Sequence, residues 1–482
     1  MLTKAMNHQT IALNRMKGRK SYGLFMEQGT GKTWCLLADA ERLFQAGEIQ
    51  ALLVIAPNGV HTNWIRREIP QHVSVPHIAR SWRTGAGKRQ IEHMCEVFEP
   101  KKGLRIFAIN IDALITKKGF AIAQDFIKMF KTMIVVDESS RIKNPAAGRT
   151  KAVMALRQFA HCARIATGTP VTNAPVDVFS QMEFLQSGLL GTANYRAFFA
   201  EYAELMKPDH PMMQRMIERN PRVARAQVVA RDKDGRPKWR NLDKLQRLLE
   251  PHTYRVRKDE CLDLPPKIYQ SHYFELSPAQ VQAYKLMENE QRMALGEELV
   301  AVQALSAGIK LQQITSGFVL HEGAPHYVSK SNPRLAALMD LIEDLDGQFI
   351  IWARFREEIR AITEMLRESK IPAVAYFGDI SAADREIAVD EFQRGAARAF
   401  VGQQQAAGMG LTLTAAQTAI YYSNDFNLEH RLQSEDRCHR KGTKGRVVYI
   451  DLVAEDSIDE TITRALQHKS DVAAAILGDL KS

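Results

Sequence analysis

The sequence has few cysteines and no long apolar run. Its five cysteines are scattered over 482 residues without a CxxC pair, which argues against a zinc finger or ribbon and fits free thiols in a reducing cytosol. The apolar runs, such as Ala51–Ala56, fall far short of the roughly 20 residues that a membrane-spanning helix needs. The polar N-terminus has no apolar signal core. We therefore expect a soluble, cytoplasmic protein without a membrane partner.

Excess charge is also absent from most of the chain. The composition, 45% hydrophobic and 25% charged, is ordinary for a globular protein and excludes a mostly disordered chain. The net charge is +10, and +9 of it falls between Lys207 and Lys258, where fifteen basic residues outnumber six acidic ones. Such a stretch is typical either of a solvated helical face or of a segment that contacts a polyanion.

Short apolar runs that are typical of buried strands occur in two separate parts of the chain. The expected strands are Tyr22–Met26, Ala51–Ala56, Arg105–Ile109 and Met133–Val136 in the first part, and Phe349–Trp352, Ala373–Tyr376, Ala399–Val401, Ala419–Tyr422 and Val447–Leu452 in the second. Helical patterns separate them, as in a parallel sheet covered by helices. Residues 186–335 show no clear strand series and include a helix for which Ser277 is the expected N-cap. The sequence therefore predicts an α/β protein with two parallel-sheet lobes in tandem and a mostly helical segment between them.

A phosphate-binding loop follows the first expected strand. Its residues are Glu27, Gln28, Gly29, Thr30, Gly31, Lys32 and Thr33, and a helix is expected at Trp34–Ala46. Glycines let backbone N–H groups surround phosphates, and the helix N-terminus adds its positive end. Lys32 would reach the β- and γ-phosphates of ATP, and the Thr33 hydroxyl would hold Mg²⁺.

Two adjacent acids follow the expected strand at Met133–Val136. Asp137 and Glu138 would lie at the carboxyl end of this strand, the edge where open α/β sheets place their ligands. Asp137 can organise Mg²⁺, and Glu138 can orient and deprotonate the attacking water. The acids and the loop together predict a site that hydrolyses ATP with Mg²⁺.

Together with further motifs, these features resemble the Swi/Snf-like branch of superfamily-two helicases, whose members are ATP-driven translocases on double-stranded DNA. The resemblance extends from about Asn7 to about Leu466. It rests on the ordered segments Asn7–Gln9, Glu27–Thr33, Val54–Pro57 with Asn63-Trp64, Asp137–Ser140, Thr167–Pro170 with Asn173, Arg255–Asp259, Ala406–Thr414 and Gln433–Gly442. It implies RecA-like lobes, with the first lobe at residues 1–185, a helical basic insertion at 186–265, a helical lead-in at 266–345, and the second lobe with C-terminal helices at 346–482.

The resemblance also implies further residues of the nucleotide site. It assigns the adenine contact to Gln9, another nucleotide contact to Gly410, and a catalytic role to Gln433, Arg437 and Arg440 of the second lobe. Arg437 and Arg440 are three residues apart, so both can point from one helix face into the same cleft. There they would stabilise the charge that builds on the γ-phosphate.

For the nucleic acid, the resemblance implies 3′→5′ tracking on one strand of duplex DNA through sequence-nonspecific backbone contacts. The expected contacts are small polar residues after strands and basic residues of the charged segment: Asn58, Asn110, Thr169, Thr412, Thr414, Arg231, Lys233, Arg236 and Lys238. We assign Trp64 and Trp352 to the core rather than to a groove that stacks single strands.

We therefore expect a DNA-dependent ATPase that moves along double-stranded DNA as a monomer, in replication, recombination or repair and with partner proteins of those processes. A compact motor of this kind suits a bacterium or a phage-infected cell and its nucleoid. Two alternatives stay open, an RNA or single-strand helicase of the same superfamily and a nucleotide-gated DNA clamp with little turnover.

Overall fold

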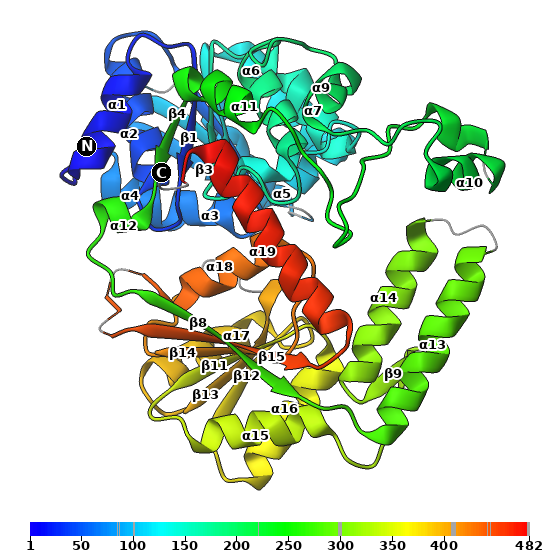
Figure 1. Ribbon diagram of the computed structural model, residues 1–482. Coiled ribbons are helices and arrows are strands. Elements are labelled where there is room, and N and C mark those ends of the chain that lie inside the picture. Colours follow the sequence, from blue (N-terminus) through cyan, green and yellow to red (C-terminus); the bar gives the residue numbers. More distant parts are fainter. Residues whose placement is uncertain are drawn as a thin grey trace. The chain divides into compact units, whose positions relative to one another are not determined.

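The computed structural model describes residues 1–83, 85, 87–99, 102–219, 221–296, 301–405, 411–440, 442–443 and 445–479 (Figure 1). The chain divides into two compact units. Unit 1 comprises Met1–Glu204, Lys238–Asp263 and Asp471–Ser482, and unit 2 comprises Leu205–Pro237 and Leu264–Ser470. Each unit is built around one parallel sheet with apolar cores on both faces.

Seven parallel strands form the sheet of unit 1, in the order β3-β4-β2-β5-β6-β1-β7. The strands are β1 (Ser21–Met26), β2 (Ala51–Ala56), β3 (His77–Ser81), β4 (Leu104–Asn110), β5 (Thr132–Asp137), β6 (Cys162–Ala166) and β7 (Thr253–Val256). On β2, Leu53 and Ile55 pack into one core, whereas Leu52 and Val54 pack into the other. Because both faces of the sheet are covered, a central strand such as β2 is apolar throughout rather than alternating.

The helices of unit 1 cover both faces of this sheet (Figure 1). They are α1 (Asn7–Met16), α2 (Lys32–Gln45), α3 (Val60–Asn63), α4 (Ile69–His72), α5 (Lys88–Cys95), α6 (Lys117–Met129), α7 (Gly148–Arg157), α8 (Phe179–Leu185), α9 (Tyr195–Tyr202), α11 (Leu242–Leu249) and α12 (Lys258–Cys261). A π-helical turn, η1 (Trp64–Glu68), connects α3 to α4.

Six parallel strands form the sheet of unit 2, in the order β12-β13-β11-β14-β15-β8. The strands are β8 (Lys267–Phe274), β11 (Phe349–Ala353), β12 (Ala373–Tyr376), β13 (Ala399–Gln403), β14 (Thr418–Tyr421) and β15 (Val447–Ala454). A separate antiparallel hairpin pairs β9 (Phe318–His321) with β10 (Ala324–Tyr327). On β11, Phe349 and Ile351 face one core, and Ile350 and Trp352 face the other.

The remaining helices are assigned wholly or in part to unit 2. They are α10 (Pro211–Arg219), α13 (Pro278–Gly296), α14 (Ala301–Thr315), α15 (Pro333–Glu343), α16 (Arg356–Glu368), α17 (Ala382–Gln393), α18 (Leu428–Cys438) and α19 (Ile458–Leu477), of which α19 begins in unit 2 and ends in unit 1. Ser277 precedes α13, and its Oγ accepts the Gln280 N–H at 3.3 Å, which confirms the expected N-cap. Across the described ranges, no helix is both long and apolar enough to cross a membrane.

The fold confirms the two parallel-sheet lobes but changes the expected picture of the segment between them. All nine expected strands are present. The segment taken as mostly helical also holds β7, β8 and the β9–β10 hairpin, so the expectation of no strand series there is wrong. The sequence does not predict β8, because its residues are largely exposed or half-buried at the edge of the sheet and form no apolar run.

The two units also divide the chain differently from the expected boundaries. Residues 205–237 group with unit 2, whereas Lys238–Asp263 and Asp471–Ser482 group with unit 1. The last segment joins unit 1 because Val472 and Ile476 share an apolar core with Leu245 and Leu249 of α11. Residues 471–479 therefore pack with the unit of the first sheet.

Candidate active site

A glycine-rich loop, Glu27–Gly31, joins β1 to α2. Gly29 and Gly31 have φ angles of +83° and +85°, a left-handed backbone that glycine adopts without steric cost. A Cβ atom on Gly31 would lie only 2.1 Å from Gln9 Nε2. The two glycines thus serve a backbone conformation and a close approach that suit a phosphate-binding loop.

The loop is closed by bonds to its own carbonyl groups. Lys32 Nζ donates to the carbonyl oxygens of Met26 at 3.0 Å and Glu27 at 3.2 Å. Thr30 Oγ1 donates to the same Glu27 carbonyl at 2.7 Å. These bonds hold the Lys32 ammonium at the N-terminus of α2, where the helix dipole also favours a phosphate.

The start of α1 lies directly against this loop. Gln9 Nε2 donates to the Thr30 carbonyl at 3.5 Å, and Gln9 Oε1 accepts the Met6 N–H at 2.9 Å. His8 Nε2 donates to the same Thr30 carbonyl at 2.8 Å. The structure therefore brings Gln9 to this loop, and it adds His8, which no sequence pattern marks apart from its position beside Gln9.

Asp137 ends β5 and is held by two donors. Its Oδ2 accepts the indole N–H of Trp64 at 2.8 Å, and its Oδ1 accepts the Glu138 N–H at 3.1 Å. Burial raises the pKa of Asp137, while the Trp64 hydrogen bond and the charge of Lys32 oppose this rise. Trp64 is buried, which agrees with its expected place in the core. Its contact with Asp137 also makes it part of the site, a role that the sequence does not predict. It projects from η1, and π-helical turns of this kind are frequent at functional sites.

Glu138 joins the acid pair to the segment after β6. Its carboxylate Oε1 accepts the Thr167 hydroxyl at 2.9 Å and the Ser140 hydroxyl at 3.4 Å. Its backbone has φ +57°, which is uncommon for a residue other than glycine and is often found at functional sites. Gly168, the residue after Thr167, lies so close to the phosphate-binding loop that a Cβ atom on it would be 3.2 Å from the backbone nitrogen of Gln28. The acid pair, Thr167 and the phosphate-binding loop therefore form one connected site.

Two oxygen donors of this site fit a magnesium ion. The Thr33 hydroxyl is half-buried in the first turn of α2, and Asp137 offers a carboxylate. Mg²⁺ prefers hard oxygen ligands and is usually held by one or two carboxylates together with substrate phosphates. Within the residues that the structure describes, no group of three or more His, Cys, Asp or Glu side chains could hold a metal alone.

The arginines of the second lobe converge on one backbone group in unit 2. Arg437 Nη1 and Arg440 Nη1 both donate to the Leu411 carbonyl, at 3.3 and 2.9 Å. Gln433 Nε2 donates to Glu429 at 3.2 Å on the same helix, α18. Arg437 lies on α18, whereas Arg440 lies beyond its end at Cys438, so the expectation of one shared helix face is wrong, although both guanidinium groups meet at the Leu411 carbonyl. Gly410 lies outside the described residues.

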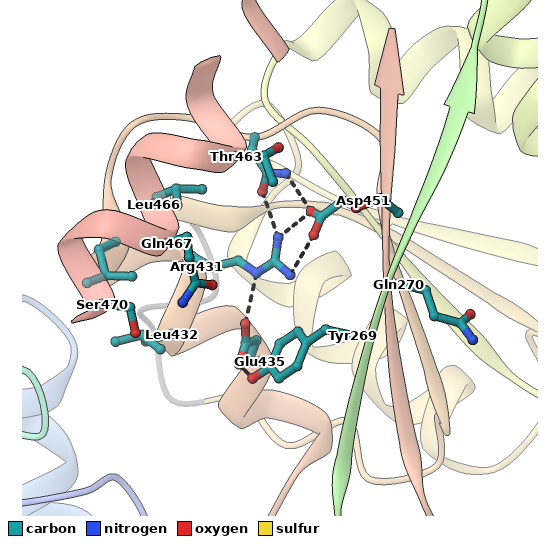
Figure 2. A pocket seen from close by; sticks show the side chains of 13 residues that line it. Tyr269, Gln270, Arg431, Leu432, Glu435, Asp451, Thr463, Leu466, Gln467 and Ser470 are labelled. Carbon is teal, nitrogen blue, oxygen red and sulfur yellow. Dashed lines mark hydrogen bonds and ion pairs between the residues drawn. The ribbon is translucent and has the colours of Figure 1, made fainter. Parts of the chain in front are cut away.

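Buried charges tie α18 to the sheet of unit 2 (Figure 2). Arg431 donates to Asp451 on β15 and, at 2.8 Å, to Glu435. Glu435 also accepts from Lys267 at 2.9 Å and from the Tyr269 hydroxyl at 2.7 Å, both on β8. Burial alone would raise the pKa of Glu435, but the charges of Lys267 and Arg431 lower it to about 2. Arg431, Glu435 and Asp451 line a pocket of about 470 Å³, and their contacts fix α18, the helix that carries Arg437.

Two of the expected DNA contacts in unit 1 lie together. Asn58 follows β2, Asn110 ends β4, and both line a pocket of about 530 Å³ with Trp82 and Arg83. The Asn110 side chain also accepts the Ala113 N–H at 2.7 Å, as an N-cap does. Parallel strands bring these side chains to one edge of the sheet.

The other small polar residues expected to contact DNA are more constrained. Thr169 is only 8% exposed, and its hydroxyl is buried without a partner in the described part of the chain. Thr412 accepts from Arg440 at 3.1 Å, and Thr414 accepts from Gln393 at 3.4 Å. Their role at DNA stays a prediction.

Within the basic stretch Lys207–Lys258, residues Arg231–Pro237 form a tight turn, called the basic turn below. Arg231 and Pro237 make an antiparallel bridge, and Asp232 Oδ1 accepts the Arg236 N–H at 2.8 Å. Lys233 is exposed at the tip, whereas Arg236 lies 3.9 Å from Asp234. Beyond the turn, in unit 1, Lys238 pairs with Glu204 at 3.3 Å. Acids thus neutralise part of the charge, and the side chains of Arg219, Arg222 and Arg225 lie outside the described set.

The two parallel-sheet units, the phosphate-binding loop and the acid pair define a helicase-type ATPase. The SNF2-related domain family matches residues 8–317, and the helicase conserved C-terminal domain matches residues 333–442. The chain therefore belongs to the SNF2-related family, and the expected family is confirmed.

Individual relatives are much longer than this chain. The DNA annealing helicase and endonuclease ZRANB3 of Mus musculus is 28% identical over 464 residues, which cover 94% of this chain and 39% of that protein. The CHD3-type chromatin-remodeling factor PICKLE of Arabidopsis thaliana is 24% identical over 489 residues, covering 95% and 33%. The chain thus spans about two fifths or less of these curated relatives. A solved structure, the Sulfolobus solfataricus SWI2/SNF2 ATPase core in complex with dsDNA, aligns with a TM-score of 0.41 and 21% identity over 100% of this chain and 96% of that one.

Proposed function

We propose that the protein is an ATP-driven translocase on double-stranded DNA. One observation carries the proposal: in unit 1, the nucleotide residues and the expected DNA contacts follow strands of one parallel sheet at the same edge. Lys32 follows β1, Asp137 ends β5, and Asn58 and Asn110 lie at the ends of β2 and β4. A change at the nucleotide can therefore reach the nucleic-acid track through a short, shared edge of the sheet.

Each residue of the site has a defined task in hydrolysis. The loop N–H groups and Lys32 would bind the β- and γ-phosphates, and Thr33 and Asp137 would hold Mg²⁺, which supplies positive charge to the phosphoryl oxygens. Glu138 would orient the attacking water and take its proton. Arg437 and Arg440 of unit 2 would stabilise the charge that develops on the γ-phosphate.

Coupling to movement would begin at Glu138. Its carboxylate is held by the Thr167 hydroxyl, and the segment after Thr167 continues to Thr169, an expected DNA contact. When the γ-phosphate and its charge leave, the hydrogen bonds of Glu138 change, and this change reaches the segment that follows β6. We expect sequence-nonspecific contacts with phosphates, since these position a protein on DNA without reading its sequence.

The proposal also includes the cellular process and location in which the motor works. We propose a monomeric motor that works in replication, recombination or repair, in the cytoplasm or nucleoid of a bacterial or phage-infected cell. The name of ZRANB3 describes a DNA annealing helicase, which supports a role on DNA for a motor of this family. Partner proteins of these processes would supply the targeting.

Measurement of ATP hydrolysis with four additives tests the proposal. The additives are duplex DNA, single-stranded DNA, RNA and buffer alone, each with the wild type and with Lys32→Ala. We expect duplex DNA to stimulate hydrolysis most and Lys32→Ala to abolish it. Stimulation only by RNA or single-stranded DNA would contradict the proposal and support the helicase alternative.

A further inference from the structure

Helix α19 takes part in both units. Near its start, Ile458, Ile462 and Leu466 form a small apolar cluster with Leu428 of α18 in unit 2. Near its end, its side chains join the core of unit 1 around α11. A single helix therefore carries one apolar contact set for each unit.

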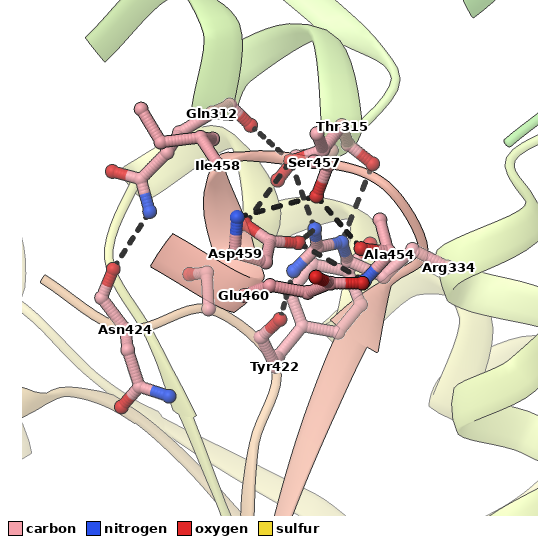
Figure 3. A network of polar contacts seen from close by, with 12 residues as sticks. Gln312, Thr315, Arg334, Tyr422, Asn424, Ala454, Ser457, Ile458, Asp459 and Glu460 are labelled. Atoms are coloured by element: carbon pink, nitrogen blue, oxygen red, sulfur yellow. Dashed lines mark hydrogen bonds and ion pairs between the residues drawn. The ribbon is translucent and has the colours of Figure 1, made fainter. Parts of the chain in front are cut away.

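The first turn of α19 is fixed in unit 2 by a buried ion pair (Figure 3). Arg334 is fully buried, and it donates to Asp459 of α19, to the Tyr422 carbonyl and, at 2.8 Å, to Thr315 Oγ1. Asp459 also accepts the Ala454 N–H at 3.2 Å. Because an unpaired buried charge is costly, this network holds the start of the helix in one place.

The other end of α19 is fixed in unit 1 beside the phosphate-binding loop. Gly478 has φ +73° and passes so close to α11 that a Cβ atom there would lie 2.5 Å from Gln246 Nε2. The next residue, Asp479, accepts from Arg255 Nε at 3.1 Å and Nη2 at 2.7 Å. The residue after the end of α19 thus forms an ion pair with Arg255.

Arg255 also contacts the phosphate-binding loop. Its Nη2 donates to Glu27 Oε1 at 3.1 Å, and its Nη1 donates to the Phe25 carbonyl of β1 at 3.3 Å. The second carboxylate oxygen of Glu27 accepts the Lys258 N–H at 2.9 Å. The Glu27 backbone carbonyl is in turn the acceptor for Thr30 Oγ1 and Lys32 Nζ. A displacement of Glu27 would therefore move the group that holds the catalytic lysine.

We propose that Glu27, Arg255 and Asp479 are positioning residues that set the geometry of the phosphate-binding loop from the end of α19. The inference rests on the proposed binding of ATP by this loop. None of the three needs to contact the nucleotide, since they act through the Glu27 carbonyl and Lys32.

Asp479→Asn tests the inference with little change in shape. It removes the charge that holds Arg255, and we expect the KM for ATP and the Kd of a fluorescent ADP analogue to rise about threefold to tenfold, with a smaller change in kcat. Asp479→Glu, which restores the carboxylate, should recover most of the affinity. Asp243→Asn is the matched control, because it breaks an exposed ion pair with Arg247 at 2.8 Å on α11 of the same unit.

The possible results separate this inference from the proposed function. If Asp479→Asn matches Asp243→Asn in both affinity and kinetics, the positioning role is overturned. If Asp479→Asn and Asp479→Glu lose affinity equally together with thermal stability, the contact is only structural, and the inference is also overturned. If wild-type hydrolysis does not depend on Lys32, the proposed function itself fails, whatever the Asp479 variants do.

Discussion

The bond between Trp64 and Asp137 allows a sharp test of how the acid that we propose to bind Mg²⁺ is held. Trp64→Phe keeps a buried aromatic ring but removes the N–H that donates to Asp137 Oδ2 at 2.8 Å. A hydrogen bond to a charged group contributes about 1.5–3 kcal/mol, which corresponds to roughly tenfold to hundredfold in an equilibrium constant. We therefore expect the Mg²⁺ concentration for half-maximal ATP hydrolysis to rise by about tenfold or more, as measured by titration of Mg²⁺ at fixed ATP.

The smaller ring also removes packing, and Trp352→Phe controls for that loss. Trp352 is as buried as Trp64, with 0% and 1% exposed surface, but its indole N–H has no hydrogen-bond partner among the described residues. Both variants should lose comparable thermal stability, because both give up similar buried aromatic surface. Only Trp64→Phe should change the Mg²⁺ dependence. The same Mg²⁺ dependence in the wild type and both variants would refute the role of Trp64.

Three further predictions concern the acid network, the basic turn and the catalytic base. Glu435→Gln should destabilise unit 2 by about 3 kcal/mol at neutral pH, since it breaks a buried ion pair. In the wild type, the pKa of Glu435 is lowered from 4.5 to about 2. Its carboxylate therefore contributes stability above about pH 4.5, and this contribution is lost as the pH falls towards 2. Thermal unfolding of the Glu435→Gln variant should therefore depend less on pH between these values. Neutralising the basic turn should weaken DNA binding and reduce the salt slope by about two to four, with DNA-free ATPase retained; an unchanged slope would show that these charges do not contact DNA. The residues to replace are Arg231, Lys233 and Arg236 of the turn, together with Lys238 just beyond it. Glu138→Gln should retain ATP binding but lower turnover by about 100-fold or more in a steady-state assay, and wild-type turnover would exclude Glu138 as the base.

The part of the site that the sequence predicts is the part encoded locally. The phosphate-binding loop needs glycines and a lysine at fixed spacing between a strand and a helix, so Gly29, Gly31 and Lys32 are visible in a few consecutive residues. Asp137 and Glu138 are visible because an apolar strand ends directly before them. Strands such as β2 and β5 are equally clear, since burial on both faces makes them apolar, whereas the central strand β6 is not predicted because the buried Arg164 interrupts its apolar run.

The residues that were missed depend on contacts between distant parts of the chain. Trp64 lies 73 positions before Asp137, and Asp479 lies 224 positions after Arg255, so no local pattern marks either pair. Both tryptophan and aspartate occur in many other settings, and only the fold brings these side chains to the site. β7 and β8 were missed for a related reason, because edge strands need not be apolar on both faces.

Displacement of a third strand from a DNA triplex tests the central proposal most directly, because only movement along the duplex removes that strand. The proposal predicts ATP-dependent displacement by the wild type and none by Glu138→Gln under the same conditions. Displacement should also fail with a nucleotide analogue that cannot be hydrolysed. If duplex DNA stimulates hydrolysis but the third strand stays bound, the protein is a nucleotide-gated clamp, and the translocase proposal is wrong.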